Sequence, residues 1–200
     1  LEDTLIAQVG EHLLEVLAAV ELPEAGDVET TAAAIAAFND TPGVASTLPT
    51  LQMLLLTLQP TDSVLEIGTG SGYLTACLAK LAGQVHSVDI HADFVEQART
   101  RLQQHDIGNV SLEVTDAAGG WSAGGGFDAI AVTGSLPVLQ RGFHQALNPG
   151  GRLFVITGRP PIMQALLITR VGEQEWNQES LFETAIPPLV NAPQPEAFTF

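Results

Sequence analysis

The feature that most constrains this chain is a glycine-rich stretch, Val64 to Tyr73, which reads Val-Leu-Glu-Ile-Gly-Thr-Gly-Ser-Gly-Tyr. It begins as a short apolar run and then carries glycine at positions 68, 70 and 72. The following run, Leu74 to Leu81, has helical spacing. Glycines let a ligand approach the backbone, and a helix start offers unpaired N–H donors. The stretch therefore predicts a strand, a ligand-binding turn and the start of a helix.

Strand-like and helix-like segments alternate after this turn. The predicted strands are 84–90, 110–114, 127–133 and 152–157, and the predicted helices are 92–104 and 137–147, with a turn at 148–151. This alternation predicts an α/β fold with a doubly wound, mostly parallel seven-stranded Rossmann-like sheet. Two final apolar runs, 165–171 and 180–186, have no helix between them, so we expect an antiparallel C-terminal hairpin at one sheet edge.

The residues before the glycine stretch have a helical pattern. Apolar residues recur at helical spacing over 5–20, and further helices are predicted from Asp27 to Phe38 and from about Ser46 to Leu58. We expect one domain over residues 1–200, with a helical N-terminal cap over 1–59 and a ligand-binding α/β core over 60–200.

The charge balance argues against a nucleic-acid partner. The chain has 23 acidic residues against 7 basic ones, a net charge of −16, and no Lys or Arg before Lys80. Nucleic-acid binding needs clustered Lys and Arg, because neutralising phosphates supplies most of the affinity. The sequence shows no apolar run long enough to span a membrane, and we expect neither a secretion signal nor a membrane partner.

Cysteine and histidine usage argues against a metal site. The single cysteine, Cys77, excludes an internal disulfide and a cysteine-cluster zinc site, and it fits a reducing cytoplasm. The five histidines have no metal-ligand spacing. We therefore expect a cytoplasmic protein without a metal.

Ligands of doubly wound sheets bind beyond the carboxyl ends of the strands. Asp89 ends its predicted strand about twenty residues after the turn, where a carboxylate would accept hydrogen bonds from ribose hydroxyls. The alternative is that Asp89 caps the helix that starts at Ala92. Asp116 follows the next strand, and in a methyltransferase arrangement its carboxylate would accept from the exocyclic amino group of adenine.

Two details favour S-adenosylmethionine over NAD as the ligand. Tyr73 stands where a dinucleotide fingerprint has its third glycine. Glu66 lies two residues before Gly68, where its charge would repel a pyrophosphate but would suit an ammonium and a sulfonium. The alternative role for Glu66 is a strand-end acid that caps local backbone amides. The predicted cofactor-binding residues are Glu66, Ile67, Gly68, Thr69, Gly70, Ser71, Gly72, Tyr73, Asp89, Ile90, Asp116, Ala117 and Thr133.

Several motifs, in this order, resemble the protein-L-isoaspartate O-methyltransferases. They are 64–73, Val88-Asp89, Asn109-Val110, Asp116, Gly120-Trp121, 127–133 and 147–153. The resemblance runs from about Pro60 to Gly158 and is weaker at 37–40 and 186–189. It implies an enzyme that transfers a methyl group from S-adenosyl-L-methionine to the carboxylate of an isoaspartyl residue, with S-adenosyl-L-homocysteine as the product.

The resemblance also points to a candidate catalytic residue. The family has a Thr-Ile-Ser-x-Pro segment ahead of the helix that leads into the glycine strand, and this chain has Ala45-Ser46-Thr47-Leu48-Pro49. Thr47 is in register with the family serine, although it could instead be a helix N-cap. Because this segment departs from the family pattern, three alternatives stay open: another carboxylate substrate, a small-molecule substrate, or a pseudo-enzyme that only binds the cofactor.

Overall fold

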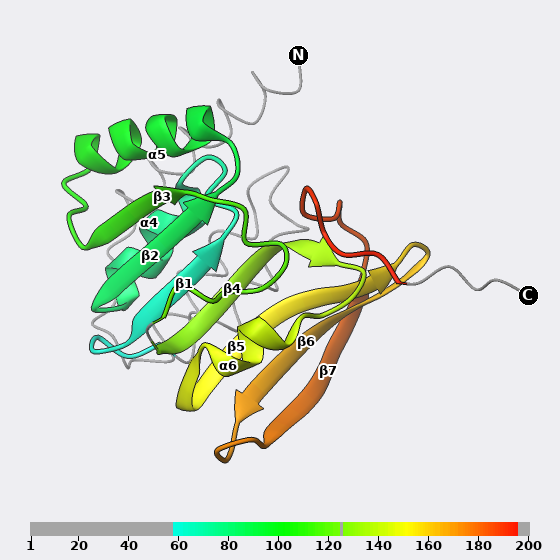
Figure 1. Cartoon of the computed structure of the whole chain (residues 1–200). Coiled ribbons are helices and arrows are strands. Elements are labelled where there is room, and N and C mark those ends of the chain that lie inside the picture. Colours follow the sequence, from blue (N-terminus) through cyan, green and yellow to red (C-terminus); the bar gives the residue numbers. More distant parts are fainter. Residues whose placement is uncertain (1–57, 125, 196–200) are drawn as a thin grey trace, which may run out of the picture.

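The computed structural model describes residues 58–124 and 126–195 (Figure 1). The predicted N-terminal helices and Thr47 lie outside these residues. The described part forms a seven-stranded sheet in the order β3-β2-β1-β4-β5-β6-β7. The elements are β1 Ser63–Ile67, α4 Tyr73–Leu81, β2 Gln84–Asp89, α5 Ala92–Gln104, β3 Val110–Val114, β4 Phe127–Leu136, α6 Arg141–Gln145, β5 Leu147–Arg159, β6 Ile162–Arg170 and β7 Trp176–Thr184.

The first five strands pair in parallel, and β6 and β7 add to the β5 edge as antiparallel strands. This confirms the predicted mixed sheet and its C-terminal hairpin. Strand β1 pairs with β2 on one side and with β4 on the other, so the order of the strands reverses at β1. The carboxyl ends of strands at such a reversal border the ligand crevice of doubly wound folds.

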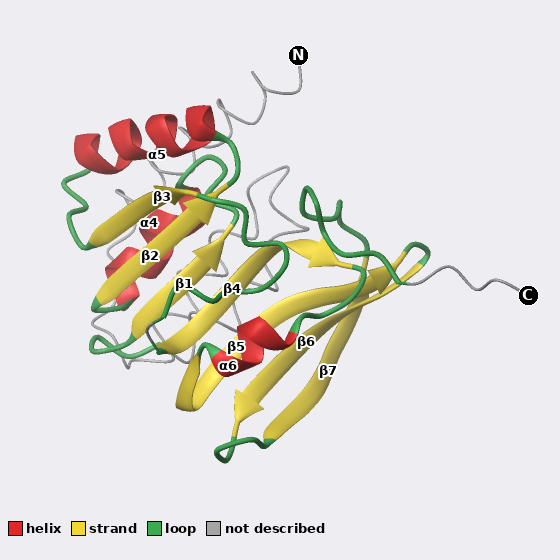
Figure 2. Ribbon diagram, in the orientation of Figure 1, coloured by secondary structure: helices red, strands yellow, loops and turns green. Residues whose placement is uncertain are grey.

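Apolar side chains from alternate strand positions cover both faces of the sheet. Val64 of β1 packs in one core cluster with Leu78 of α4, whereas its neighbour Leu65 packs in the other with Phe143 of α6. Figure 2 shows α4 behind the sheet and α6 in front of it. Strands buried on both faces read as continuous apolar runs, which is the pattern of the stretch that became β1.

The prediction of a helix over 137–147 is wrong in its bounds. Helix α6 covers only Arg141–Gln145, because β4 continues to Leu136 and β5 already begins at Leu147. The predicted turn at 148–151 is an irregularity within β5, since Phe127 pairs with Leu147 and Ala129 next pairs with Arg152. Gly150 in this segment has a φ of 79°, which few residues other than glycine adopt readily.

Candidate functional site

The carboxyl ends of β1 and β2 border a pocket of about 180 Å³, next to the loop that follows β3. Six of the predicted cofactor-binding residues line it: Ile67, Gly68, Asp89, Ile90, Asp116 and Ala117. The remaining lining residues are His91, Phe94, Val88, Thr115, Ala118, Pro188, Leu189 and Val190. The pocket therefore places two carboxylates from different strand ends among mostly apolar walls.

The first two glycines of the turn have different environments. Gly68 has a φ of 99°, and a Cβ at this position would lie 2.1 Å from Oγ1 of Thr133. The Thr133 hydroxyl is 2.9 Å from the carbonyl oxygens of both Ile67 and Gly68, so it can donate to either. Gly70, with a φ of 50°, has no atom within 4 Å of such a Cβ. The fold thus requires glycine at 68, whereas the backbone at 70 faces open space.

The end of the turn serves helix packing. Gly72 is the N-cap of α4, and a Cβ on it would lie 2.9 Å from Cβ of Ala98 on α5. Arg101, also on α5, donates to the carbonyl oxygen of Ser71 over 2.9 Å. Tyr73 begins α4 and is buried, which raises the pKa of its hydroxyl. None of Ser71, Gly72 and Tyr73 lines the pocket.

Asp89 joins the end of β2 to the glycine turn. The backbone N–H of Gly70 donates to its Oδ2, and that of His91 donates to its Oδ1, both over 2.9 Å. His91 is the N-cap residue of α5, so the carboxylate supports the start of this helix as well as lining the pocket. Each carboxylate oxygen can accept more than one hydrogen bond, so these contacts leave acceptor capacity for a ligand.

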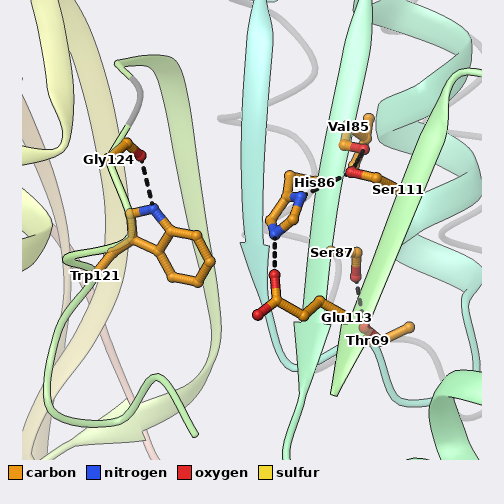
Figure 3. A network of polar contacts seen from close by, with 8 residues as sticks. All are labelled: Thr69, Val85, His86, Ser87, Ser111, Glu113, Trp121 and Gly124. Carbon is orange, nitrogen blue, oxygen red and sulfur yellow. Dashed lines mark hydrogen bonds and ion pairs between the residues drawn. The ribbon is translucent and has the colours of Figure 1, made fainter. Parts of the chain in front are cut away.

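Glu66 lies beneath the turn and does not line the pocket. Its side chain is fully buried, and the hydroxyls of Thr75 and Ser87 each donate to its Oε2 over 2.5 Å. The Thr69 hydroxyl lies 2.6 Å from that of Ser87 and extends this network toward the turn (Figure 3). Its partners are hydroxyls, not the backbone amides of the alternative capping role. Oε1 is buried without a hydrogen-bond partner among the described residues, and burial raises the pKa of the carboxyl to about 7.

Asp116 follows β3 and is held at both carboxylate oxygens. Oδ1 accepts from the backbone N–H of Ala118 over 3.0 Å, and Oδ2 accepts from the side-chain amide of Asn191 over 2.8 Å. Ala117, which lies between Asp116 and Ala118, is buried and lines the pocket.

Sequence reasoning missed the contribution of residues 185–195, here called the C-terminal strap. This segment lies beside the carboxyl end of β4 (red in Figure 1), where Ser135 donates its N–H to Pro187 O and accepts from Leu189 N–H, both over 3.0 Å. Pro188, Leu189 and Val190 line the pocket. The only sequence signal was the weak family resemblance at 186–189. Phe94 was also missed, although its place in the first turn of α5 puts it beside the end of β2.

A second polar group lies away from the pocket. His86 of β2 lies 2.7 Å from the Ser111 hydroxyl through Nδ1 and 3.1 Å from the Glu113 carboxylate through Nε2 (Figure 3). The Trp121 ring meets the His86 ring edge-on at 5.3 Å between centroids. His86 and Ser87 are neighbours in a strand, so their side chains point to opposite faces of the sheet. The His86 group is thus separate from the Glu66 network.

A larger hollow of about 640 Å³ lies between α6 and the β6–β7 turn. It contains none of the predicted site residues; its lining is Arg141, His144, Gln145, Arg170, Glu173, Gln174 and Trp176. The Arg170 guanidinium donates to the carbonyl oxygens of Leu147, Gly172 and Glu173, so its position is fixed by the fold. We therefore assign the candidate site to the smaller pocket.

Across 58–124 and 126–195, no three His, Cys, Asp or Glu side chains come together as a possible metal site. None of the helices in these ranges is long and apolar enough to cross a membrane.

Comparisons with known proteins agree on one family. The model of the protein-L-isoaspartate(D-aspartate) O-methyltransferase (PCMT) family matches residues 32–194. Protein-L-isoaspartate O-methyltransferase of Pseudoalteromonas atlantica is 41% identical over 139 residues, which are 70% of this chain and 65% of that protein. Protein-L-isoaspartate O-methyltransferase 1 of a Polaromonas species is 40% identical over 116 residues, which are 58% of this chain and 49% of that protein. The chain thus spans about half to two thirds of the length of these relatives.

A solved structure shares the fold. It comes from Plasmodium falciparum, is assigned as a protein-L-isoaspartate O-methyltransferase and contains S-adenosyl-L-homocysteine. The TM-score is 0.62 at 22% identity, over 71% of this chain and 72% of that one. Because the family model covers well over half of the 200 residues, the chain belongs to the protein-L-isoaspartate(D-aspartate) O-methyltransferase family.

Proposed function

We propose that this protein binds S-adenosyl-L-methionine in the pocket at the glycine turn and methylates the free carboxylate of L-isoaspartyl residues in proteins. The observation that carries the proposal is the pair of carboxylates, Asp89 and Asp116, on an apolar pocket at the point where the strand order reverses. The names of the relatives and the S-adenosyl-L-homocysteine in the Plasmodium structure support the same ligand and substrate class.

The residues of the pocket fit this cofactor. Asp89 has acceptor capacity left for ribose hydroxyls, with Ile90 beside it, and Asp116 with Ala117 would hold the adenine edge. The backbone from Gly68 to Gly70 would approach the methionine end, because the space next to Gly70 is open. Glu66 and Thr69 would act from beneath, by holding the turn through hydrogen bonds that meet at the Ser87 hydroxyl.

The main task of the protein in this reaction is to position the two reactants. Bound S-adenosyl-L-methionine supplies a methyl group already activated by its sulfonium, and the isoaspartyl carboxylate is already a nucleophile. The chain would contribute by holding the two in line, which is a large part of the rate enhancement of such reactions. We propose Thr47 as the residue that orients the acceptor carboxylate, and residues 1–59 as a cap of the same single domain.

Asp89→Ala tests the cofactor site. The variant loses charge-assisted acceptors for the ribose, so S-adenosyl-L-homocysteine should bind about 1–3 kcal/mol more weakly. Isothermal titration calorimetry measures the difference, and thermal melting checks the fold. Asp93→Ala is the matched control, because Asp93 is exposed in the first turn of α5 and should leave the affinity unchanged. Equal affinity in Asp89→Ala and wild type would contradict the assignment.

A further inference from the structure

Asn191 occupies a backbone position that few side chains tolerate. Its φ of 61° lies in the left-handed region, which costs most residues roughly 1–2 kcal/mol and in which Asn is enriched. The position follows Val190, which lines the pocket, and is the third residue of the turn in which Ala192 N–H donates to Leu189 O over 3.1 Å. This conformation brings the Asn191 side chain to Asp116, 75 residues earlier in the chain.

The hydrogen bond from Asn191 holds the second carboxylate oxygen of Asp116 in place. Asp116 is exposed, and an exposed carboxylate held at one oxygen can still rotate. The Ala118 N–H holds Oδ1 and the Asn191 amide holds Oδ2, so both oxygens have a defined place before any ligand arrives. Fixing an acceptor in advance removes part of the ordering cost of binding.

The strap itself is anchored independently of Asn191. The Ser135 hydroxyl donates to Ile186 O over 3.0 Å, and the Ser135 backbone pairs with Pro187 and Leu189. A Cβ on Gly134 would lie 2.6 Å from Cδ2 of Leu189, so the strap packs directly on β4. Removing the Asn191 amide should therefore free Asp116 without detaching the strap.

We propose that Asn191 is a positioning residue that orients Asp116 and so sets the preference of the pocket for a 6-amino purine. The inference rests on the proposed function, because it takes Asp116 as the acceptor for the adenine amino group. A 6-oxo purine presents an oxygen where adenine presents an N–H donor, so a fixed carboxylate repels it. A carboxylate that is free to rotate discriminates less between a 6-amino purine and a 6-oxo purine.

The Asn191→Gly substitution removes the side-chain amide and keeps the left-handed backbone conformation, which glycine adopts at little cost. It therefore tests the contribution of the amide alone. Calorimetry with S-adenosyl-L-homocysteine and its 6-oxo analogue S-inosyl-L-homocysteine gives two affinities for each protein. We expect the variant to bind S-adenosyl-L-homocysteine about threefold to tenfold more weakly, the equivalent of one hydrogen bond. Its preference over the 6-oxo analogue should fall by a similar factor. Asn191→Asp, which places a second carboxylate against Asp116, should lose at least as much.

A double-mutant cycle shows whether Asn191 acts through Asp116. In an Asp116→Ala background, Asn191→Gly should cause no further loss of affinity. Unchanged affinity and preference in Asn191→Gly, or an equal loss in both backgrounds, would overturn the inference while leaving the proposed function intact. A wild-type protein that fails to bind S-adenosyl-L-homocysteine would contradict the proposed function and this inference together.

Discussion

Glu66 shows how one residue can support a site without touching it. It sits at the second-last position of β1, but its side chain enters the core, where the hydroxyls of Thr75 and Ser87 hold one oxygen and the other has no partner among the described residues. Burial outweighs these two hydrogen bonds, and the nearby Asp89 charge adds to it, so the pKa of the carboxyl rises. A buried acid with a raised pKa makes the stability of the folded chain depend on pH.

The sign of this dependence is opposite to that of a salt-bridged acid. The pKa of Glu66 rises from 4.5 to about 7 on folding, so between these values the folded protein holds a proton that the unfolded chain has lost. The stabilising contribution is fully present below pH 4.5 and is lost as the pH rises toward 7. Over that window the free energy of unfolding should fall by about 3 kcal/mol from this group alone.

The Glu66→Gln substitution removes the ionisable carboxyl and keeps the shape of the side chain. Urea unfolding of wild type and variant at a series of pH values isolates the contribution, because other groups titrate alike in both proteins. We expect the wild type to lose about 3 kcal/mol of stability relative to the variant as the pH rises from 4.5 to above 7. A difference that stays constant with pH, or one that grows in favour of the wild type, would contradict the raised pKa.

At the scale of single elements, α4 depends on a side chain from a distant loop. The carbonyl groups of the last helical turn have no partner within the helix. Asn109, just before β3, donates its side-chain amide to the carbonyl oxygens of Ala79 over 2.7 Å and of Ala82 over 3.1 Å. It therefore caps the helix that starts at the glycine turn and ties it to the edge of the sheet.

Asn109→Ala should lower the free energy of unfolding by about 1–2 kcal/mol, because the carbonyl groups of Ala79, Ala82 and Gly83 lose a side-chain donor. Chemical denaturation measures this change. Asn177→Ala is the matched control: Asn177 is exposed on β7, and its side-chain amide donates to the nearby Glu179 carboxylate over 3.3 Å. The control should stay within about 0.5 kcal/mol of wild type. An equal effect of the two substitutions would show that the cap contributes nothing to stability.

The elements differ in how well the sequence predicted them. Helix α5 and strand β3 have the predicted bounds, because a regular apolar period lies between clear breaks. The length of the helix after β4 was overestimated, because Pro137 is as compatible with the end of a strand as with a helix start. The strap that pairs with the end of β4 also comes about 50 residues later in the chain. Pairing between distant segments leaves no local pattern.

The same limit applies to the site. The placement of Asp89 and Asp116 beside one pocket was predictable, because the ends of consecutive parallel strands converge at one edge of the sheet. The direction of the Glu66 side chain was not predictable, since the strand alternation allows it to face either the pocket or α4. The role of Asn191 depends on a left-handed turn and a contact across 75 residues, and no short motif indicates either.

At the scale of the whole molecule, the fold gathers the proposed chemistry at one edge of the sheet. The glycine turn after β1, the end of β2, the loop after β3 and the C-terminal strap all border one pocket. The net charge of −16 disfavours nucleic acid as a partner and is compatible with the protein acceptor proposed above. Family membership and the geometry of the pocket both support the proposed methyl transfer to isoaspartyl residues.

The most direct test of this claim is a methyl-transfer assay with labelled S-adenosyl-L-methionine on an isoaspartyl peptide and on its aspartyl twin. We expect the wild-type chain to label only the isoaspartyl peptide, and Asp89→Ala to label it far more slowly at limiting cofactor. Cofactor binding without labelling of either peptide would contradict the proposed substrate and favour another acceptor or a binding-only role. Equal labelling of the two peptides would contradict the claim that the enzyme recognises the isoaspartyl linkage.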